Sequence, residues 1–60
     1  MHTYRLVDAY GAVYKQGIVF RHLSICLRHA EAAQERITRA AEAGHTSRLR
    51  LSIQIFSVGA

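Results

Sequence analysis

The sequence predicts an α+β fold of order ββαβ, in which one amphipathic helix packs on a three-stranded, mostly antiparallel sheet of strand order 2-1-3. Three observations predict this fold. Two short β-branched and aromatic segments begin the chain, a long stretch of helical period follows, and an alternating segment comes last. The 60 residues are expected to form a single domain (1–60), because compact domains usually contain about 50 to 250 residues.

Residues 4–7 and 13–20 are the first predicted strands, and a short turn joins them into a hairpin. Asp8 can accept a hydrogen bond from the backbone two residues further on, and Gly11 can adopt the positive φ that such turns often need. Gly17, inside the second segment, predicts a β-bulge, where one extra residue would change the face on which its neighbours project.

Residues 22–43 form the predicted helix, because apolar side chains recur there at steps of three and four residues. The expected core-facing residues are Leu23, Cys26, Leu27, Ala30, Ala33, Ile37, Ala40 and Ala41. Gly44 is expected to end the helix in the left-handed conformation, whereas at the start Ser24 is the only good capping residue nearby.

Residues 48–56 alternate between apolar and polar side chains, as expected for a half-buried strand. The residues that share its apolar face are Leu49, Leu51, Ile53 and Ile55. If the helix returns the chain to the start of the sheet, this strand lies antiparallel beside the first, which gives the order 2-1-3. A right-handed parallel crossover beside the second strand is the alternative.

In the order 2-1-3 the last strand, predicted to be the longest, lies at an edge with little protection. It has no proline, no lysine and no charge after Arg50, although natural proteins usually block such an edge. We expect a symmetry mate or a partner strand to pair with it. A homodimer is expected, because so short a chain with a single cysteine forms neither a large core nor an internal disulfide. The expected oligomer or partner edge consists of Ile53, Ile55, Phe56 and Val58.

Basic residues are predicted to gather on the face of the sheet that the helix leaves open. The chain has a formal net charge of +4, which points to nucleic acid or to an acidic protein or nucleoprotein surface as partner. Arginine can hydrogen-bond guanine and glutamine can hydrogen-bond adenine, while other basic side chains hold phosphates. The predicted contact set is Arg5, Lys15, Arg48, Arg50 and Gln54. The alternative is that these charges only keep an open sheet face soluble.

No constellation of residues predicts catalysis, so we expect no enzyme, no cofactor and no small-molecule substrate. The acidic residues form no acid–base pair, and the glycines form no phosphate-binding loop before a helix. On spacing alone, His22, Cys26 and His29 could form a three-ligand zinc face. Because Cys26 falls in the apolar arc and no fourth ligand is nearby, we expect no metal site but a buried thiol flanked by two histidines.

These observations favour a small, basic, non-catalytic binding protein that binds nucleic acid in a regulatory role through the Arg-lined sheet face. The alternative is a small inhibitor of the kind that phages and mobile elements encode, anti-CRISPR-like, which blocks a host protein complex by docking through its edge strand. The longest uncharged run, residues 51–60, is far shorter than the ~20 residues that span a bilayer. The first residues lack the features of a signal peptide, so we expect a cytoplasmic protein with no membrane partner.

Overall fold

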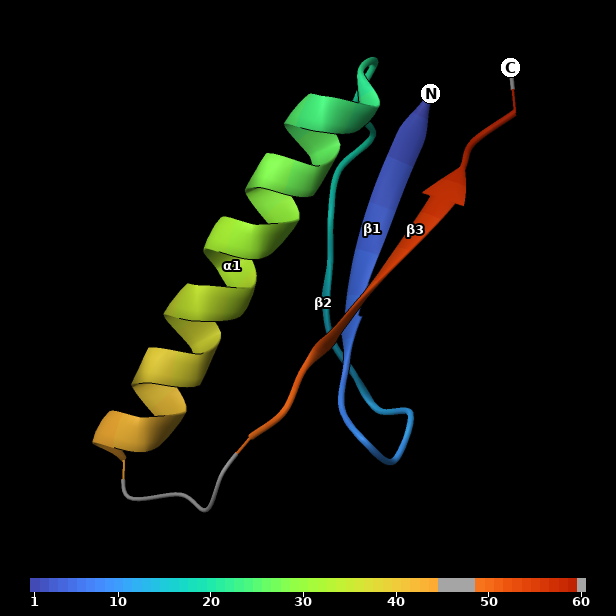
Figure 1. Cartoon of the computed structure of the whole chain (residues 1–60). Helices are drawn as coiled ribbons and strands as arrows, with labels where there is room; N and C mark the ends of the chain where they lie inside the picture. Colours follow the sequence, from blue (N-terminus) through green and yellow to red (C-terminus); the bar gives the residue numbers. More distant parts are fainter. Residues whose placement is uncertain (45–48, 60) are drawn as a thin grey trace.

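The computed structural model describes residues 1–44 and 49–59, and within them three strands and one helix follow the predicted order. They are β1 (His2–Val7), β2 (Val13–Gln16), α1 (Leu23–Ala43) and β3 (Ser52–Ser57). β1 lies in the middle of the sheet and pairs antiparallel with β2 on one side and β3 on the other (Figure 1). The order 2-1-3 is therefore confirmed. β3 has the same length as β1, so the last strand is not the longest.

The turn between β1 and β2 is built around the side chain of Asp8. Its Oδ1 accepts hydrogen bonds from the backbone N–H of Tyr10 at 2.8 Å and of Ala12 at 2.9 Å. Gly11 has a φ of 84°, the positive value that the sequence predicted. The Asp8 carboxylate thus has a structural role in closing the hairpin.

β2 is shorter than predicted, because the register of the pairing between β1 and the second segment changes along the hairpin. β2 carries one extra residue, Tyr14, at a shift in register. After β2 ends, Gly17 donates its N–H to the carbonyl oxygen of Tyr4 at 2.8 Å, and an isolated bridge joins Phe20 to His2. Between these two contacts β1 has one residue where the second segment has two, which is the mismatch that defines a bulge. The bulge expected at Gly17 therefore follows it directly.

The start of α1 has no side-chain cap, and its end differs from the left-handed end that the sequence predicted. His22 is the N-cap residue and makes no side-chain capping bond, so Ser24 lies inside the first turn instead of capping it. At the other end Gly44 has a φ of −83°, which is not left-handed, and its N–H donates to the carbonyl oxygen of Ala40 at 3.1 Å. The helix consequently depends on packing more than on caps. No helix within residues 1–44 and 49–59 is long and apolar enough to cross a bilayer.

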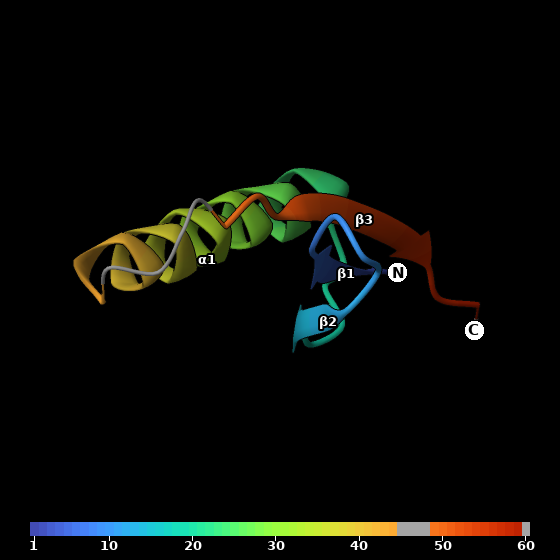
Figure 2. The same ribbon diagram turned by 90° about the horizontal axis from the view of Figure 1, so that it is seen from below.

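α1 covers only part of one face of the sheet. It packs against β1 and β3 without reaching β2, and no described element covers the opposite face (Figure 2). The buried core lies between α1 and these two strands. Its members are Tyr4, Leu6, Cys26, Ala30, Ala33 and Leu51, and the partly buried residues around them are Phe20, Ile37, Leu49 and Ile53.

The helix contributes only small side chains to the buried core. Cys26, Ala30 and Ala33 face the sheet, and their small size lets α1 lie close to β1. Leu23 and Leu27, predicted to be core residues, are instead 49% and 40% exposed. The prediction is wrong for these two leucines because Cys26, Ala30 and Ala33 point at the sheet, and Leu23 and Leu27 lie to one side of this line.

Candidate docking surface along the free edge of β3

The outer edge of β3 presents free backbone groups. Val58, just after β3, donates its N–H to the carbonyl oxygen of Met1 at 2.8 Å. Along an antiparallel ladder, successive residues alternately point their backbone groups toward and away from the neighbouring strand. The residues of β3 that therefore point toward β1 are Ser52, Gln54 and Phe56. The residues that point outward, where no described segment pairs with them, are Ile53, Ile55 and Ser57.

Apolar side chains lie beside this edge on the helix side of the sheet. Ile53 and Ile55 pair with the core residues of β1, so they project toward α1. Gln34 of α1 donates its Nε2–H to the carbonyl oxygen of Leu51 at 2.6 Å, which places that flank of the helix next to the strand. Leu27 lies two turns before Gln34 on the same flank, and Leu23 lies one turn before Leu27. We call Leu23, Leu27, Ile53 and Ile55 the apolar strip.

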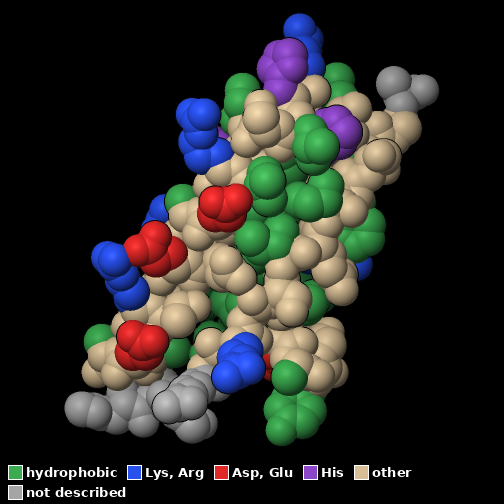
Figure 3. Space-filling model, in the orientation of Figure 1, with side chains coloured by type: hydrophobic (Ala, Val, Ile, Leu, Met, Phe, Trp, Pro, Cys, Tyr) green, Lys and Arg blue, Asp and Glu red, His purple; other side chains and the backbone are tan. Residues whose placement is uncertain are grey.

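The apolar strip is accessible and uncharged. Hydrophobic side chains gather between α1 and β3 on this face of the molecule (Figure 3). Ile55 is 38% exposed, and Ile53 is half-buried. No charged residue occurs from Leu51 to Val58. The free backbone groups and the exposed apolar side chains therefore lie side by side and form a candidate docking surface.

The other edge of the sheet, along β2, is protected. β2 is only four residues long, contains Lys15 and carries the extra residue Tyr14. Short strands, lysine side chains and bulges are three devices by which proteins prevent edge-to-edge pairing. Since β3 has none of these devices, the two edges of the sheet differ in their capacity to accept another strand.

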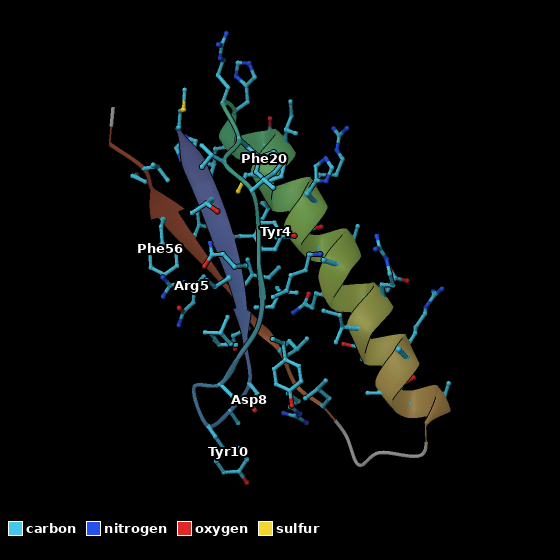
Figure 4. The ribbon with its side chains drawn as sticks, turned by 180° about the vertical axis from the view of Figure 1, so that it is seen from behind. Tyr4, Arg5, Asp8, Tyr10, Phe20 and Phe56 are labelled. Carbon is cyan, nitrogen blue, oxygen red and sulfur yellow. The ribbon has the colours of Figure 1, made fainter. Side chains whose placement is uncertain are left out.

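Arg5 lies on the open face of the sheet, opposite to the core. Its Nε donates a hydrogen bond to Oε1 of Gln16 at 2.7 Å, and its guanidinium carbon lies 4.9 Å from the centre of the Phe56 ring (Figure 4). Gln16 also donates to the Thr3 hydroxyl at 3.2 Å, and Gln54 pairs with Arg5 from β3. These contacts hold the Arg5 side chain in one orientation.

The other basic residues of the predicted contact set do not gather around Arg5. Lys15 pairs with Leu6, so it projects from the helix side of the sheet, which corrects the expectation that it shares the open face. Arg50 is exposed and precedes β3. Arg48 lies outside the described residues. Of the described members of the predicted set, only Arg5 and Gln54 are paired neighbours on the open face.

The predicted edge residues divide between the two faces of the sheet. Ile53 and Ile55 belong to the apolar strip and also carry outward backbone groups. Phe56 lies on the open face against Arg5, and Val58 is half-buried beside the start of β1. Sequence reasoning missed the two leucines of the strip. The signal that could have found them is the run of small helix residues, beside which both leucines lie.

Cys26 and the two histidines near it are not grouped as metal ligands. The Cys26 side chain is fully buried, and this burial raises the pKa of its thiol, so the reactive thiolate is disfavoured. The His29 ring packs against Phe20 in a tilted arrangement with 4.9 Å between ring centres, while His22 is exposed at the start of α1. Among the described residues no three His, Cys, Asp or Glu side chains are grouped so that they could hold a metal ion.

Searches of protein families, curated proteins and solved structures found no match to this chain.

Proposed function

We propose that this chain is a non-catalytic protein-binding module that joins its partner by strand addition along the β3 edge. The observation that carries the proposal is the row of outward backbone groups at Ile53, Ile55 and Ser57, which lies directly beside the apolar strip. Natural proteins usually protect an exposed edge of this kind against pairing, so we expect an unprotected edge to pair with another strand.

Strand addition divides recognition between the backbone and the side chains. The partner's backbone hydrogen-bonds the outward groups of β3 and supplies affinity, while its alternate side chains enter the apolar strip and supply specificity. The surroundings of the two groups best suited to catalysis, the Asp8 carboxylate and the Cys26 thiol, support a non-catalytic role. The Asp8 carboxylate accepts hydrogen bonds within its own turn, and the Cys26 thiol is buried.

Photo-cross-linking in living cells tests this proposal. A photoreactive benzoylphenylalanine at Leu27 lies in the apolar strip, and the same residue at Tyr10 is the control, because Tyr10 is 96% exposed at the tip of the hairpin. We expect covalent protein adducts from Leu27 and few from Tyr10. Adding Ile55→Pro should abolish the Leu27 adducts, because proline removes an outward N–H that no other strand of the described chain uses. Equal yields from both positions, or adducts that survive Ile55→Pro, would refute the proposal.

A second candidate function, nucleic-acid binding on the open sheet face, is favoured by one observation. Arg5 is exposed and is held by Gln16 and Phe56, and Phe56 itself is 38% exposed. An oriented arginine beside an aromatic ring can contact a phosphate and stack on a base. This candidate rests on a single basic residue of the described face, so it ranks below strand addition.

Binding of a fluorescent single-stranded RNA tests the second candidate. Arg5→Ala should weaken binding several-fold, and affinity should fall as salt rises because phosphate contacts release counterions. Arg39→Ala is the control, since it removes the same charge from the exposed flank of α1, where Arg39 pairs with Glu35. Equal affinities of the two variants, or binding that does not respond to salt, would exclude the open face as a nucleic-acid site.

A further inference from the structure

We propose that the strand that completes this sheet is β3 of a second copy of the chain, so that two copies form a two-fold homodimer with one continuous sheet. This inference rests on the proposed function and names the partner of the same edge. Four features of the described residues support it, namely the surface area, the backbone pattern of β3, the position of α1 and the distribution of charge.

The exposed area is larger than a compact monomer of this mass requires. The chain exposes 4617 Å², roughly 700 Å² more than the ~3,900 Å² expected from its mass. Its radius of gyration is 12.1 Å, against about 10 Å for a compact chain of this length. A standard protein–protein interface buries about 800 Å² on each partner. The excess exposed area therefore matches what one such interface would cover.

The backbone pattern of β3 is complementary to itself. In a two-fold antiparallel pairing centred on Ile55, each outward residue meets an outward residue of the second copy: Ile55 meets Ile55, and Ile53 meets Ser57. On the helix side, the isoleucines of the two strips then lie together. On the open face, Gln54 lies beside Phe56 of the second copy. All the outward groups of β3 find partners in this register.

The position of α1 fits the same arrangement. The helix lies over β1 and β3, so in the dimer the two helices would run on the same side of the joined sheet, one on each side of the symmetry axis. Adjacent strands are about 4.8 Å apart, which places the two helices about 10 Å from each other, the spacing of directly packed helices. Leu23 and Leu27 of each copy would fill the space between them.

The strand part of this interface brings no like charges together. Two chains of net charge +4 repel each other, but the segment from Leu51 to Val58 carries no charge. Antiparallel pairing also directs Arg50 of one copy away from Arg50 of the other, toward opposite ends of the interface. A second copy can therefore bind with little electrostatic penalty at the contact itself.

Sedimentation equilibrium of the purified chain tests the inference, with the monomer mass and twice that mass as the two references. We expect the wild type to sediment as a dimer that dissociates on dilution. Leu27→Glu should weaken the dimer at least tenfold, because it places two like charges in the strip. Ala32→Glu should sediment as wild type, since it adds the same charge to the same helix at an exposed position outside the strip.

Ile55→Pro and Ile55→Ala separate the backbone from the side chain. Both remove the isoleucine, but only proline removes the outward N–H, so Ile55→Pro should be monomeric while Ile55→Ala keeps a weaker dimer. The outward direction of this N–H leaves the β1–β3 ladder intact, and circular dichroism checks that the variant stays folded. A wild type that is monomeric at every concentration, or a dimer that resists Leu27→Glu, overturns the inference.

The cross-linking experiment distinguishes failure of the inference from failure of the proposed function. Leu27 adducts of twice the chain mass support both proposals. Adducts of another mass that disappear with Ile55→Pro overturn the homodimer and leave strand addition standing, with a different protein as the partner. The absence of any adduct that depends on Ile55 overturns both.

Discussion

Gly17 shows how one residue without a side chain shapes the core. Tyr4 is only 3% exposed, and its ring lies where a Cβ on Gly17 would be placed, so any other residue at position 17 would overlap it. Phe20 then stacks on Tyr4 with 6.2 Å between ring centres (Figure 4). The ring of His29 packs in a tilted arrangement against Phe20. Gly17 is therefore required for the packing of the largest core side chain, in addition to its place beside the bulge.

Gly17→Ala should lower the free energy of unfolding by about 1–3 kcal/mol, the usual cost of inserting an extra methyl group into a packed site. Urea denaturation followed by circular dichroism measures this change. Gly59→Ala is the matched control, because a Cβ there meets no atom within 4 Å. If both variants unfold at the same urea concentration, the contact between Gly17 and Tyr4 is not limiting for stability.

Cys26 links the stability of the fold to pH. Burial raises the pKa of the thiol in the folded state above that in the unfolded state, because the buried site disfavours the charged thiolate. The stability that comes from the neutral thiol is fully present below the unfolded thiol pKa of about 8.5 and is lost as pH rises through the folded pKa.

The melting temperature of the wild type should therefore fall as pH rises above about 8.5, and that of Cys26→Ala should fall less steeply. The variant will be less stable at neutral pH because it leaves a small cavity, so the slope with pH is the informative quantity. Parallel curves for the two proteins would show that the Cys26 thiol does not couple to folding.

At the scale of the element, patterns in the sequence predict the structural features that depend on interactions between residues close together in the chain. The alternation after Arg50 predicts both β3 and the face that its isoleucines share, and Asp8 with Gly11 predicts the turn, because each depends on residues close together in the chain. The order 2-1-3 follows from the helix returning the chain to the start of the sheet. The fold class is thus predictable from the sequence.

Features that depend on contact between distant segments are not predictable in this way. β2 ends at Gln16 because the bulge that follows Gly17 interrupts the ladder, and nothing inside residues 13–20 shows that Gly17 packs against the ring of Tyr4. Leu27 looks like a core residue on a helical wheel. It lies on the flank because small side chains at Cys26 and Ala30 bring the helix close to the sheet, which leaves no space between them for a leucine.

At the scale of the whole molecule, the candidate site divides into a predictable and an unpredictable part. The free β3 edge follows directly from the strand order, but of the four edge residues named from the sequence only Ile53 and Ile55 carry outward backbone groups. The basic face could not be predicted, because it required basic residues of separate segments to project from the same side of the sheet. Lys15 projects to the opposite face after the register of the hairpin is set, and Arg5 alone of the described strand residues puts a positive charge on the open side.

The domain is a thin, extended layer whose principal extents are 41, 20 and 12 Å. One helix against three strands covers one side of β1 and β3, and leaves the outer edge of β3 with unpaired backbone groups next to exposed leucine and isoleucine side chains. Pairing of another strand with β3 would both supply partners for these backbone groups and cover these side chains. The sheet is therefore expected to be complete only in an assembly.

Amide hydrogen exchange of the wild type, resolved by residue with NMR, tests most directly whether the β3 edge is paired. The N–H groups of Gln54 and Phe56 bond to β1 and should exchange slowly in any folded state. If another strand pairs with β3, the N–H groups of Ile53 and Ile55 should be protected as well, and Leu27→Glu should remove their protection alone. Rapid exchange of Ile53 and Ile55 in the concentrated wild type, beside slow exchange of Gln54 and Phe56, would contradict pairing at this edge.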